Sequence, residues 1–220
     1  MTFVITFVRD RLQTASKGWK SLQGSVADRL GAQFAFLNEA DRLKSVLRAT
    51  TLCDGSRREN TAEHSWHIVL YAMVLADQAA PEVDINRVIR MLILHDLVEI
   101  DVGDVPIHSA NGAAHASLAT QAAEQRAADR IFGLLPSDLA AGFRALWDEF
   151  EAAETVDAIF AKSLDRVQPV MANLQSGGGT WVTYNVTAEQ LDTRVGTKIA
   201  RGAPALWAHV RAQTARFFGA

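Results

Sequence analysis

The sequence predicts an all-α fold, because apolar residues recur at helical spacing and helix-capping residues precede several of the apolar segments. Strand signals are weak by comparison: TWVTYNV alternates somewhat and allows at most a short β-hairpin near residues 180–186. Typical helix lengths then give roughly seven to ten helices. The clearest stripe lies in residues 151–175, where the apolar positions alternate between steps of four and three: Phe160, Leu164, Val167, Met171 and Leu174.

Two helix starts are predicted in the first third of the chain. Asn38 precedes EADRLKSVL, and asparagine is a favoured N-cap residue. Asn60 and Glu63 have the spacing of a capping box, which places His64 in the first turn of the helix that follows. The face that carries this histidine continues through Ile68, so we expect His64 to lie beside the core.

Two further helix starts are predicted at Asp84 and Thr187. Asp84 precedes INRVIRMLILHDLVEI, a segment that is apolar nearly all round and should therefore be buried. Thr187 and Gln190 have capping-box spacing before the C-terminal helix. Between these starts, SGGGT at residues 176–180 is the most glycine-rich point of the chain and indicates a loop.

Composition and charge are those of a soluble globular enzyme or binding protein. The chain has 220 residues, of which 49% are apolar and 21% charged, and its formal net charge is -3. This length fits one domain, and the balanced charge gives no reason to expect a nucleic-acid polymer as partner. Cys53 is the only cysteine, so we expect no intramolecular disulfide and a cytoplasmic protein. The apolar opening MTFVITFV ends at Arg9 and is too short for a membrane span.

A polar pair, His95 and Asp96, interrupts the buried helical segment MLILHDLVEI, and Glu99 follows three residues later. At helical spacing these three ionisable groups share one face. Unpaired charge inside a protein is costly, so another group must compensate it, and a divalent cation would do so. Imidazole nitrogen and carboxylate oxygen together suit ions such as Mn, Co, Ni, Zn or Fe(II). Two residues elsewhere in the chain could complete such a site: His64 and Asp165.

In this order, His64, the adjacent pair His95 and Asp96, and then Asp165 resemble the H…HD…D signature of the HD-domain metal-dependent phosphohydrolases. The segments RRENTAEHSWH, HDLVEIDVGD and SLDRVQP are similar to the branch that contains the bacterial 5'-deoxynucleotidases and their eukaryotic HD-domain relatives. The resemblance covers about residues 32–185. It implies that the four signature residues bind one divalent metal ion, with Mg as a further possible identity, in a compact multi-helix core.

The same resemblance implies a domain division and an assembly. Residues 32–220 would form the phosphohydrolase domain, including the C-terminal helix, and residues 1–31 would be an N-terminal extension of uncertain structure. Proteins of this family are often homodimers, so we expect a homodimer here. The partner would otherwise be a small phosphorylated substrate.

Several further residues acquire roles from the resemblance. Glu99 matches the acidic residue that orients or deprotonates the attacking water, and Asp104 matches a carboxylate that contacts the sugar hydroxyl. Arg48 has the position of a phosphate-binding arginine. Arg58 could help to fix the phosphate or could pair with a nearby carboxylate. The chain also departs from the family: Ala49 replaces an aromatic residue, and PIHSANG replaces an aromatic-containing run.

The sequence thus predicts a phosphohydrolase that uses metal-activated water to remove phosphate from a small phosphomonoester, in particular a (deoxy)nucleoside 5'-monophosphate. Glu99 would accept the proton from the water. Two alternatives stay open. If His108 and His115 supplied ligands for a second metal, the protein would be a binuclear HD-domain oxygenase or phosphodiesterase, although their segment resembles a loop entering a helix. The other alternative is a metal-dependent nucleotide-binding protein without turnover.

Overall fold

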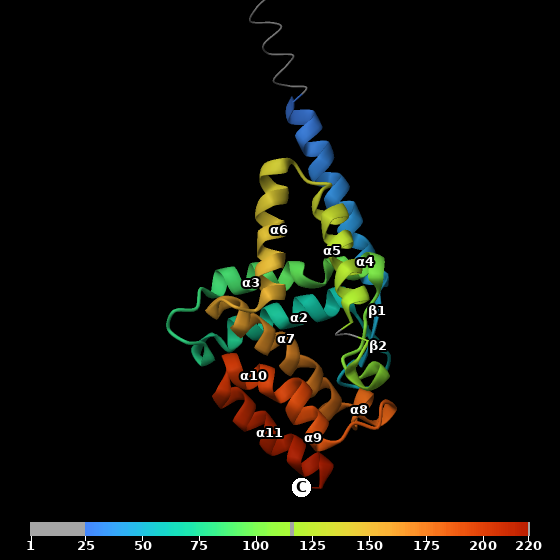
Figure 1. Ribbon diagram of the computed structural model, residues 1–220, viewed down its shortest axis with the longest axis vertical. Coiled ribbons are helices and arrows are strands. Elements are labelled where there is room, and N and C mark those ends of the chain that lie inside the picture. Colours follow the sequence, from blue (N-terminus) through green and yellow to red (C-terminus); the bar gives the residue numbers. More distant parts are fainter. Residues whose placement is uncertain (1–24, 115–116, 220) are drawn as a thin grey trace, which may run out of the picture.

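The computed structural model describes residues 25–114 and 117–219 (Figure 1). The predicted all-α fold is confirmed, since helices account for most of the described chain and the sheet contains two short strands. Residues 25–41 form one long helix. The predicted domain boundary between residues 31 and 32 therefore falls inside a helix, and residues 1–24 of the predicted extension lie outside the described residues.

The elements follow one another along the chain. The α-helices are α2 (Thr61–Val74), α3 (Ile85–Leu94), α4 (Glu99–Val102), α5 (Leu118–Phe132), α6 (Ser137–Ala152), α7 (Val156–Gln175), α8 (Gly179–Thr183), α9 (Ala188–Leu191), α10 (Thr197–Gly202) and α11 (Pro204–Phe218). Shorter helical turns are the 3-10 segments η1 (Arg42–Ser45), η2 (Ala76–Gln78), η3 (His95–Val98) and η4 (Ser109–Gly112), and the π-helical segment η5 (Asp192–Gly196). Strands β1 (Leu47–Thr51) and β2 (Arg58–Asn60) pair antiparallel, with an irregularity in the register between them.

The predicted capping residues begin three of these helices. At α2, the Asn60 side chain accepts from the Glu63 backbone N–H while Glu63 accepts in return from Asn60, which is the predicted capping box. Asp84 accepts from two backbone N–H groups in the first turn of α3. Thr187 and Gln190 form the second predicted box, but it begins the short helix α9 and not the C-terminal helix α11. Each cap satisfies backbone donors that a helix start leaves without an intrahelical partner.

Two sequence expectations are wrong. Asn38 does not begin a helix, because the helix of residues 25–41 runs through it. Residues 180–186 form no hairpin arm; Gly179–Thr183 is the helix α8 instead. Trp181 explains this difference, since it is buried and packs against Phe217 and Phe218 at ring-centroid distances of 5.2 and 5.3 Å. Tertiary packing of an aromatic side chain has overridden a weak alternating pattern.

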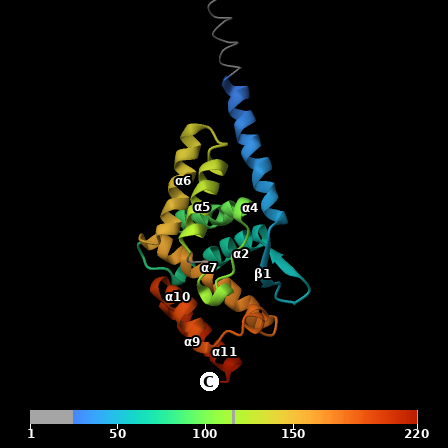
Figure 2. The same ribbon diagram turned by 45° about the vertical axis from the view of Figure 1, so that its right-hand side comes forward.

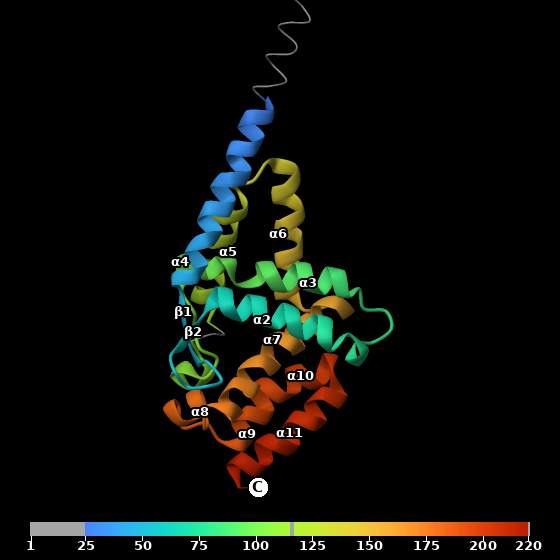
Figure 3. The ribbon, with the colours of Figure 1, turned by 180° about the vertical axis from the view of Figure 1, so that it is seen from behind.

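Helix α7 is the central element of the molecule. Figures 1 and 2 show it between α5 and α6 on one side and α9 to α11 on the other, and Figure 3 shows α2 and α3 side by side from behind. The predicted stripe on α7 serves two cores: Phe160 and Leu164 pack in the larger one, and Val167 packs in a smaller one with α8 to α11. Among the described residues, no helix is both long enough and apolar enough to cross a bilayer.

Candidate active site

The site is built around a change of helical geometry at His95. Helix α3 ends at Leu94, and the chain continues as the 3-10 segment η3 before α4 begins at Glu99. The Trp147 indole N–H donates to the backbone oxygen of His95 at 3.0 Å. Because side chains three residues apart eclipse one another in a 3-10 helix, this segment helps to direct Asp96 and Glu99 to the same side.

Both site histidines have one ring nitrogen committed to a neighbouring acceptor. His95 Nδ1 lies 2.8 Å from the backbone oxygen of Leu92, and His64 Nδ1 lies 2.8 Å from the Gln168 side-chain oxygen. An amide oxygen can only accept, so each Nδ1 carries a hydrogen. When either ring is neutral, its Nε2 therefore offers the lone pair, which is the form of imidazole that binds a metal ion.

The two Nε2 atoms meet two carboxylates. His64 Nε2 lies 3.1 Å from Asp165 Oδ1 and 3.8 Å from Asp96 Oδ2. His95 Nε2 lies 3.0 Å from Asp96 Oδ1 and 3.6 Å from Asp165 Oδ1. His64, His95 and Asp96 each offer a ligand atom within 4.8 Å of the others, and they form the one such group of potential metal ligands in residues 25–114 and 117–219. All four predicted ligand residues thus converge in a buried position.

The carboxylates of this cluster favour a positive charge among them. Burial alone would lower the pKa of His95, but Asp96 and Asp165 raise it to about 10. Burial opposes the charge of both carboxylates as well, yet His95 holds the pKa of Asp96 well below its usual value, and Arg166 does the same for Asp165. Without a metal ion, a proton on His95 supplies the positive charge. A divalent cation would replace that proton, as metal binding to imidazole and carboxylate requires.

Glu99 stands beside the cluster without joining it. Its Oε2 accepts a hydrogen bond of 2.8 Å from the Thr61 hydroxyl, and its Oε1 lies 4.0 Å from the Arg48 guanidinium. Burial and the negative charge of Asp96 raise the pKa of Glu99 well above its ordinary value. A carboxylate with a raised pKa is a stronger base than an exposed one, so Glu99 is suited to accept a proton.

The Arg48 guanidinium lies within 4.0 Å of four carboxylates at the mouth of the cluster, those of Glu59, Asp96, Glu99 and Asp104. Its guanidinium lies 3.1 Å from Asp96 Oδ2 and 3.7 Å from Asp104 Oδ1. Asp104 is fixed in turn, because its Oδ2 accepts from the Ala49 backbone N–H at 3.1 Å. A mostly buried guanidinium surrounded by acids keeps its charge and can bind the oxygen atoms of a phosphate.

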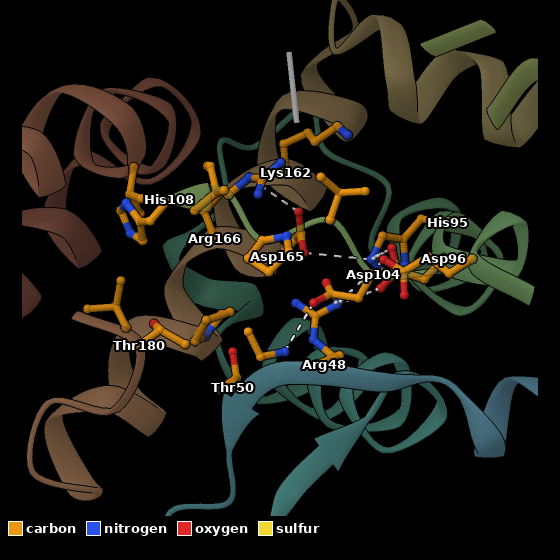
Figure 4. A pocket seen from close by; sticks show the side chains of 18 of the residues that line it. Arg48, Thr50, His95, Asp96, Asp104, His108, Lys162, Asp165, Arg166 and Thr180 are labelled. Atoms are coloured by element: carbon orange, nitrogen blue, oxygen red, sulfur yellow. Dashed lines mark hydrogen bonds and ion pairs between the residues drawn. The ribbon is translucent and has the colours of Figure 1, made fainter. Parts of the chain in front are cut away.

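One pocket joins these residues to a second set of side chains (Figure 4). Arg48, His95, Asp96, Glu99, Asp104 and Asp165 line it, while His64 is fully buried and is not part of the lining. The predicted substrate residue Arg58 is not in the pocket lining. It is exposed, and its guanidinium donates to the backbone oxygens of Arg48 and Leu47 on β1. Arg58 therefore braces the strand that carries Arg48.

Of the two histidines of the binuclear alternative, His108 alone is among the described residues. His108 lines the same pocket, but it is not in the group of potential ligands found among the described residues. His115 lies outside the described residues.

Some site residues were not singled out from the sequence. Gln168 fixes His64, and Thr61 donates to Glu99. Lys162 and Arg166 add positive charge to the pocket lining from α7, where Lys162 also lies 2.9 Å from Glu151. The only signal for Gln168 is its position three residues after Asp165 in SLDRVQP, which places both on one helix face.

A family model matches the part of the chain that contains this site. Residues 40–207 match the model described as HD domain. The chain belongs to the HD domain family. Members of this family that are metal-dependent phosphohydrolases require a divalent metal ion, and the buried group of His64, His95, Asp96 and Asp165 fits one, because its nitrogen and oxygen lone pairs face one another.

Individual relatives are similar over most of the chain. A crystal structure from Magnetospirillum magnetotacticum MS-1, described as a predicted metal-dependent phosphohydrolase, is 48% identical with a TM-score of 0.79, and the match covers 86% of this chain and 95% of that one. A conserved hypothetical protein from Pyrococcus furiosus shares the fold, with 21% identity, a TM-score of 0.59 and coverage of 81% and 99%.

Curated relatives carry the name 5'-deoxynucleotidase. Human 5'-deoxynucleotidase HDDC2 is 28% identical over 137 residues, which are 62% of this chain and 64% of the human protein. The match thus spans slightly less than two thirds of the human relative's length. A 5'-deoxynucleotidase from Erwinia tasmaniensis is 26% identical over 161 residues, covering 70% of this chain and 81% of that protein.

Proposed function

We propose that this chain is a metal-dependent phosphohydrolase that releases phosphate from nucleoside 5'-monophosphates. The observation that carries the proposal is the convergence of His64, His95, Asp96 and Asp165 beside Glu99 in a buried pocket. The similarity to proteins named 5'-deoxynucleotidase supports the nucleotide as substrate.

The proposed roles follow from the contacts of each side chain. A divalent ion held by His64, His95, Asp96 and Asp165 would lower the pKa of water and offset negative charge on the phosphate. Arg48 would bind phosphate oxygens, because its guanidinium already faces the pocket among carboxylates.

We assign catalytic roles to Glu99 and Asp104. Glu99, which the hydrogen bond from Thr61 orients, would take a proton from the attacking water. Asp104 has one oxygen held by the Ala49 N–H, which leaves Oδ1 to accept a hydrogen bond from a sugar hydroxyl as well as the pairing with Arg48.

The test is phosphate release from a panel of ribo- and deoxyribonucleoside 5'-monophosphates. Metal-stripped protein is resupplied separately with Co, Mn, Mg, Zn, Ni or Fe(II), and Glu99→Gln is compared with the wild type. We expect metal-dependent release that Glu99→Gln reduces by about 100-fold or more, since it removes the proton acceptor and keeps the size of the side chain.

The control is Asp101→Asn, which changes an exposed carboxylate two residues away whose partner is Arg130. This variant should hydrolyse the panel at the wild-type rate. Absence of phosphate release with every metal, from protein that binds one metal ion per chain, would overturn the proposal in favour of nucleotide binding without turnover.

The proposal includes one metal ion per chain, a functional unit of residues 32–220, a reducing cytoplasmic environment and a homodimer. The match of residues 40–207 to the family model supports the unit, and the exposed thiol of Cys53, the only cysteine, is compatible with a reducing compartment.

Light scattering of the purified chain would test the dimer. Two exposed apolar stripes support the dimer. The stripe on the helix of residues 25–41 consists of Val26, Leu30, Phe34 and Leu37, and the stripe on α2 consists of Trp66, Leu70, Met73 and Val74.

A further inference from the structure

The pocket continues beyond the metal ligands to an end that contains His108. In Figure 4, His108 and Thr180 lie on one side, His95 and Asp96 lie on the other, and Asp165 and Arg166 are between them. His108 is only 6% exposed. Its Nδ1 is fully buried and has no hydrogen-bond partner in the described part of the chain. A buried ring nitrogen without a partner is rare enough in folded proteins to require an explanation.

The segment that carries His108 is held in place at a cost in backbone conformation. Ala110 and Asn111 follow it with φ values of 45° and 54°, a left-handed conformation that residues with a Cβ rarely adopt. The Asn111 side-chain oxygen accepts hydrogen bonds from Arg194 at 2.5 Å and from Gln190 at 3.4 Å, which attaches the segment to α9 and η5. Strained backbone that is anchored by side chains often positions a functional residue.

The imidazole of His108 is neutral in this environment. Burial lowers its pKa to about 4, and the nearby charges of Arg194 and Arg166 act in the same direction. A neutral ring has one donor nitrogen and one acceptor nitrogen, so Nδ1 can bond to either kind of group on an uncharged ligand. It is poorly suited to bind an anion, which a protonated ring would favour.

The walls around this end are mostly apolar. Asn173 and Thr180 provide polar atoms, but they are largely bonded to each other: the Asn173 oxygen accepts from the Thr180 N–H at 3.0 Å, and its amide donates to the Thr180 hydroxyl at 2.8 Å. Five apolar residues of the smaller core also line the pocket, from the loop before η4, α7, α8, α9 and η5: Ile107, Val170, Trp181, Leu191 and Val195. Apolar walls beside a hydrogen-bonding group such as His108 Nδ1 are typical of a site for an uncharged, largely planar organic group.

We propose that the His108 end of the pocket receives the heteroaromatic base of the nucleotide, and that His108 Nδ1 forms a hydrogen bond with the edge of that base. This inference rests on the proposed function for the position of the phosphate at the opposite end, beside Arg48. His108 is then a specificity-determining residue. The segment PIHSANG, in which the chain departs from the 5'-deoxynucleotidases, supplies this contact.

The first test compares substrates with and without a base. The ratio kcat/KM is measured for nucleoside 5'-monophosphates and for methyl phosphate, with the wild type, His108→Ala, His108→Asn and His209→Ala. His209 is an exposed histidine on α11 and serves as the matched control.

We expect His108→Ala to lower kcat/KM for nucleotides about tenfold, the effect of one lost hydrogen bond, and to leave methyl phosphate within about twofold. His108→Asn, whose amide lies near the position of Nδ1, should recover part of the loss. Equal losses on both kinds of substrate would overturn the inference, because they would indicate a general structural role.

A second measurement separates this inference from the proposed function. Binding of phosphate-free nucleosides to the metal-free protein is followed by calorimetry for the same variants. Weaker binding to His108→Ala than to the wild type would support the base site even if no phosphate were released from any substrate. Equal nucleoside binding by the wild type and His108→Ala would overturn it even if phosphate release were established.

Discussion

Replacement of Gln168 by leucine should weaken metal binding as well as stability. Gln168 is buried, its oxygen accepts from His64 Nδ1 at 2.8 Å, and its nitrogen donates to Glu59 at 3.1 Å. Leucine fills a similar volume but leaves both partners without a bond inside the protein. At about 1–3 kcal/mol for each of the two stranded groups, we expect the free energy of unfolding to fall by about 2–6 kcal/mol. Loss of the group that orients His64 should lower metal affinity about 10–100-fold.

Asn173→Leu is the matched control for this prediction. Asn173 is an equally buried amide on the same helix with two hydrogen bonds of its own, both to Thr180, and neither bond involves the metal ligands. Urea unfolding of the metal-free variants should show similar losses of stability for Asn173→Leu and Gln168→Leu. Competition with a chromogenic chelator should show weaker metal binding for Gln168→Leu alone. Wild-type affinity in Gln168→Leu, or an equal loss of affinity in both variants, would refute the role assigned to Gln168.

Three further substitutions give distinct expected results. Thr61→Val removes the hydrogen bond that lowers the pKa of Glu99, so kcat should fall about tenfold and the acidic limb of its pH profile should move to higher pH. Burial raises the pKa of Glu124 from 4.5 to about 7, so the folded protein loses stability as the pH rises through this range. Glu124→Gln cannot ionise and should avoid this loss. In urea unfolding, its free energy of unfolding relative to the wild type should therefore rise by about 1 kcal/mol between pH 5 and pH 8. Trp147→Phe leaves the His95 carbonyl without its donor and a small cavity beside it, so the free energy of unfolding in urea should fall by about 2–3 kcal/mol.

Of the four proposed metal ligands, His95 and Asp96 could be singled out from the sequence because their signal is local. A histidine and an aspartate side by side in a buried apolar run, as His95 and Asp96 are, require compensation wherever the helix lies. The contacts that prepare the ligands for a metal ion are not local. Gln168 bonds to a histidine 104 positions away, and Trp147 donates to a carbonyl 52 positions away. No spacing rule in one sequence joins such pairs.

For secondary structure too, features set by local contacts could be predicted, and features set by distant contacts could not. The caps at Asn60, Asp84 and Thr187 could be predicted because a cap bonds to backbone within three residues. The position of the two-stranded sheet could not, because β1 is polar and mixed in sequence and is fixed by pairing with β2 and by the Arg58 guanidinium. Residues 180–186 alternate more clearly than β1, yet residues 180–183 belong to α8, where Trp181 is buried.

The sequence predicts one continuous helix after Asp84, but the structure changes helical geometry at His95, within the site. In a regular α-helix through this segment, the His95 carbonyl would accept from the backbone N–H of Glu99, four residues further on. The chain changes to 3-10 geometry at the polar pair, and Trp147 accounts for it by donating to the His95 carbonyl from α6. Since 3-10 hydrogen bonds are weaker than those of an α-helix, the local cost has to be met by tertiary contacts. His95 and Asp96 are easy to single out from the sequence, but their segment would not adopt this geometry alone. The residue that holds it there, Trp147, is far away in the sequence and is therefore hard to predict.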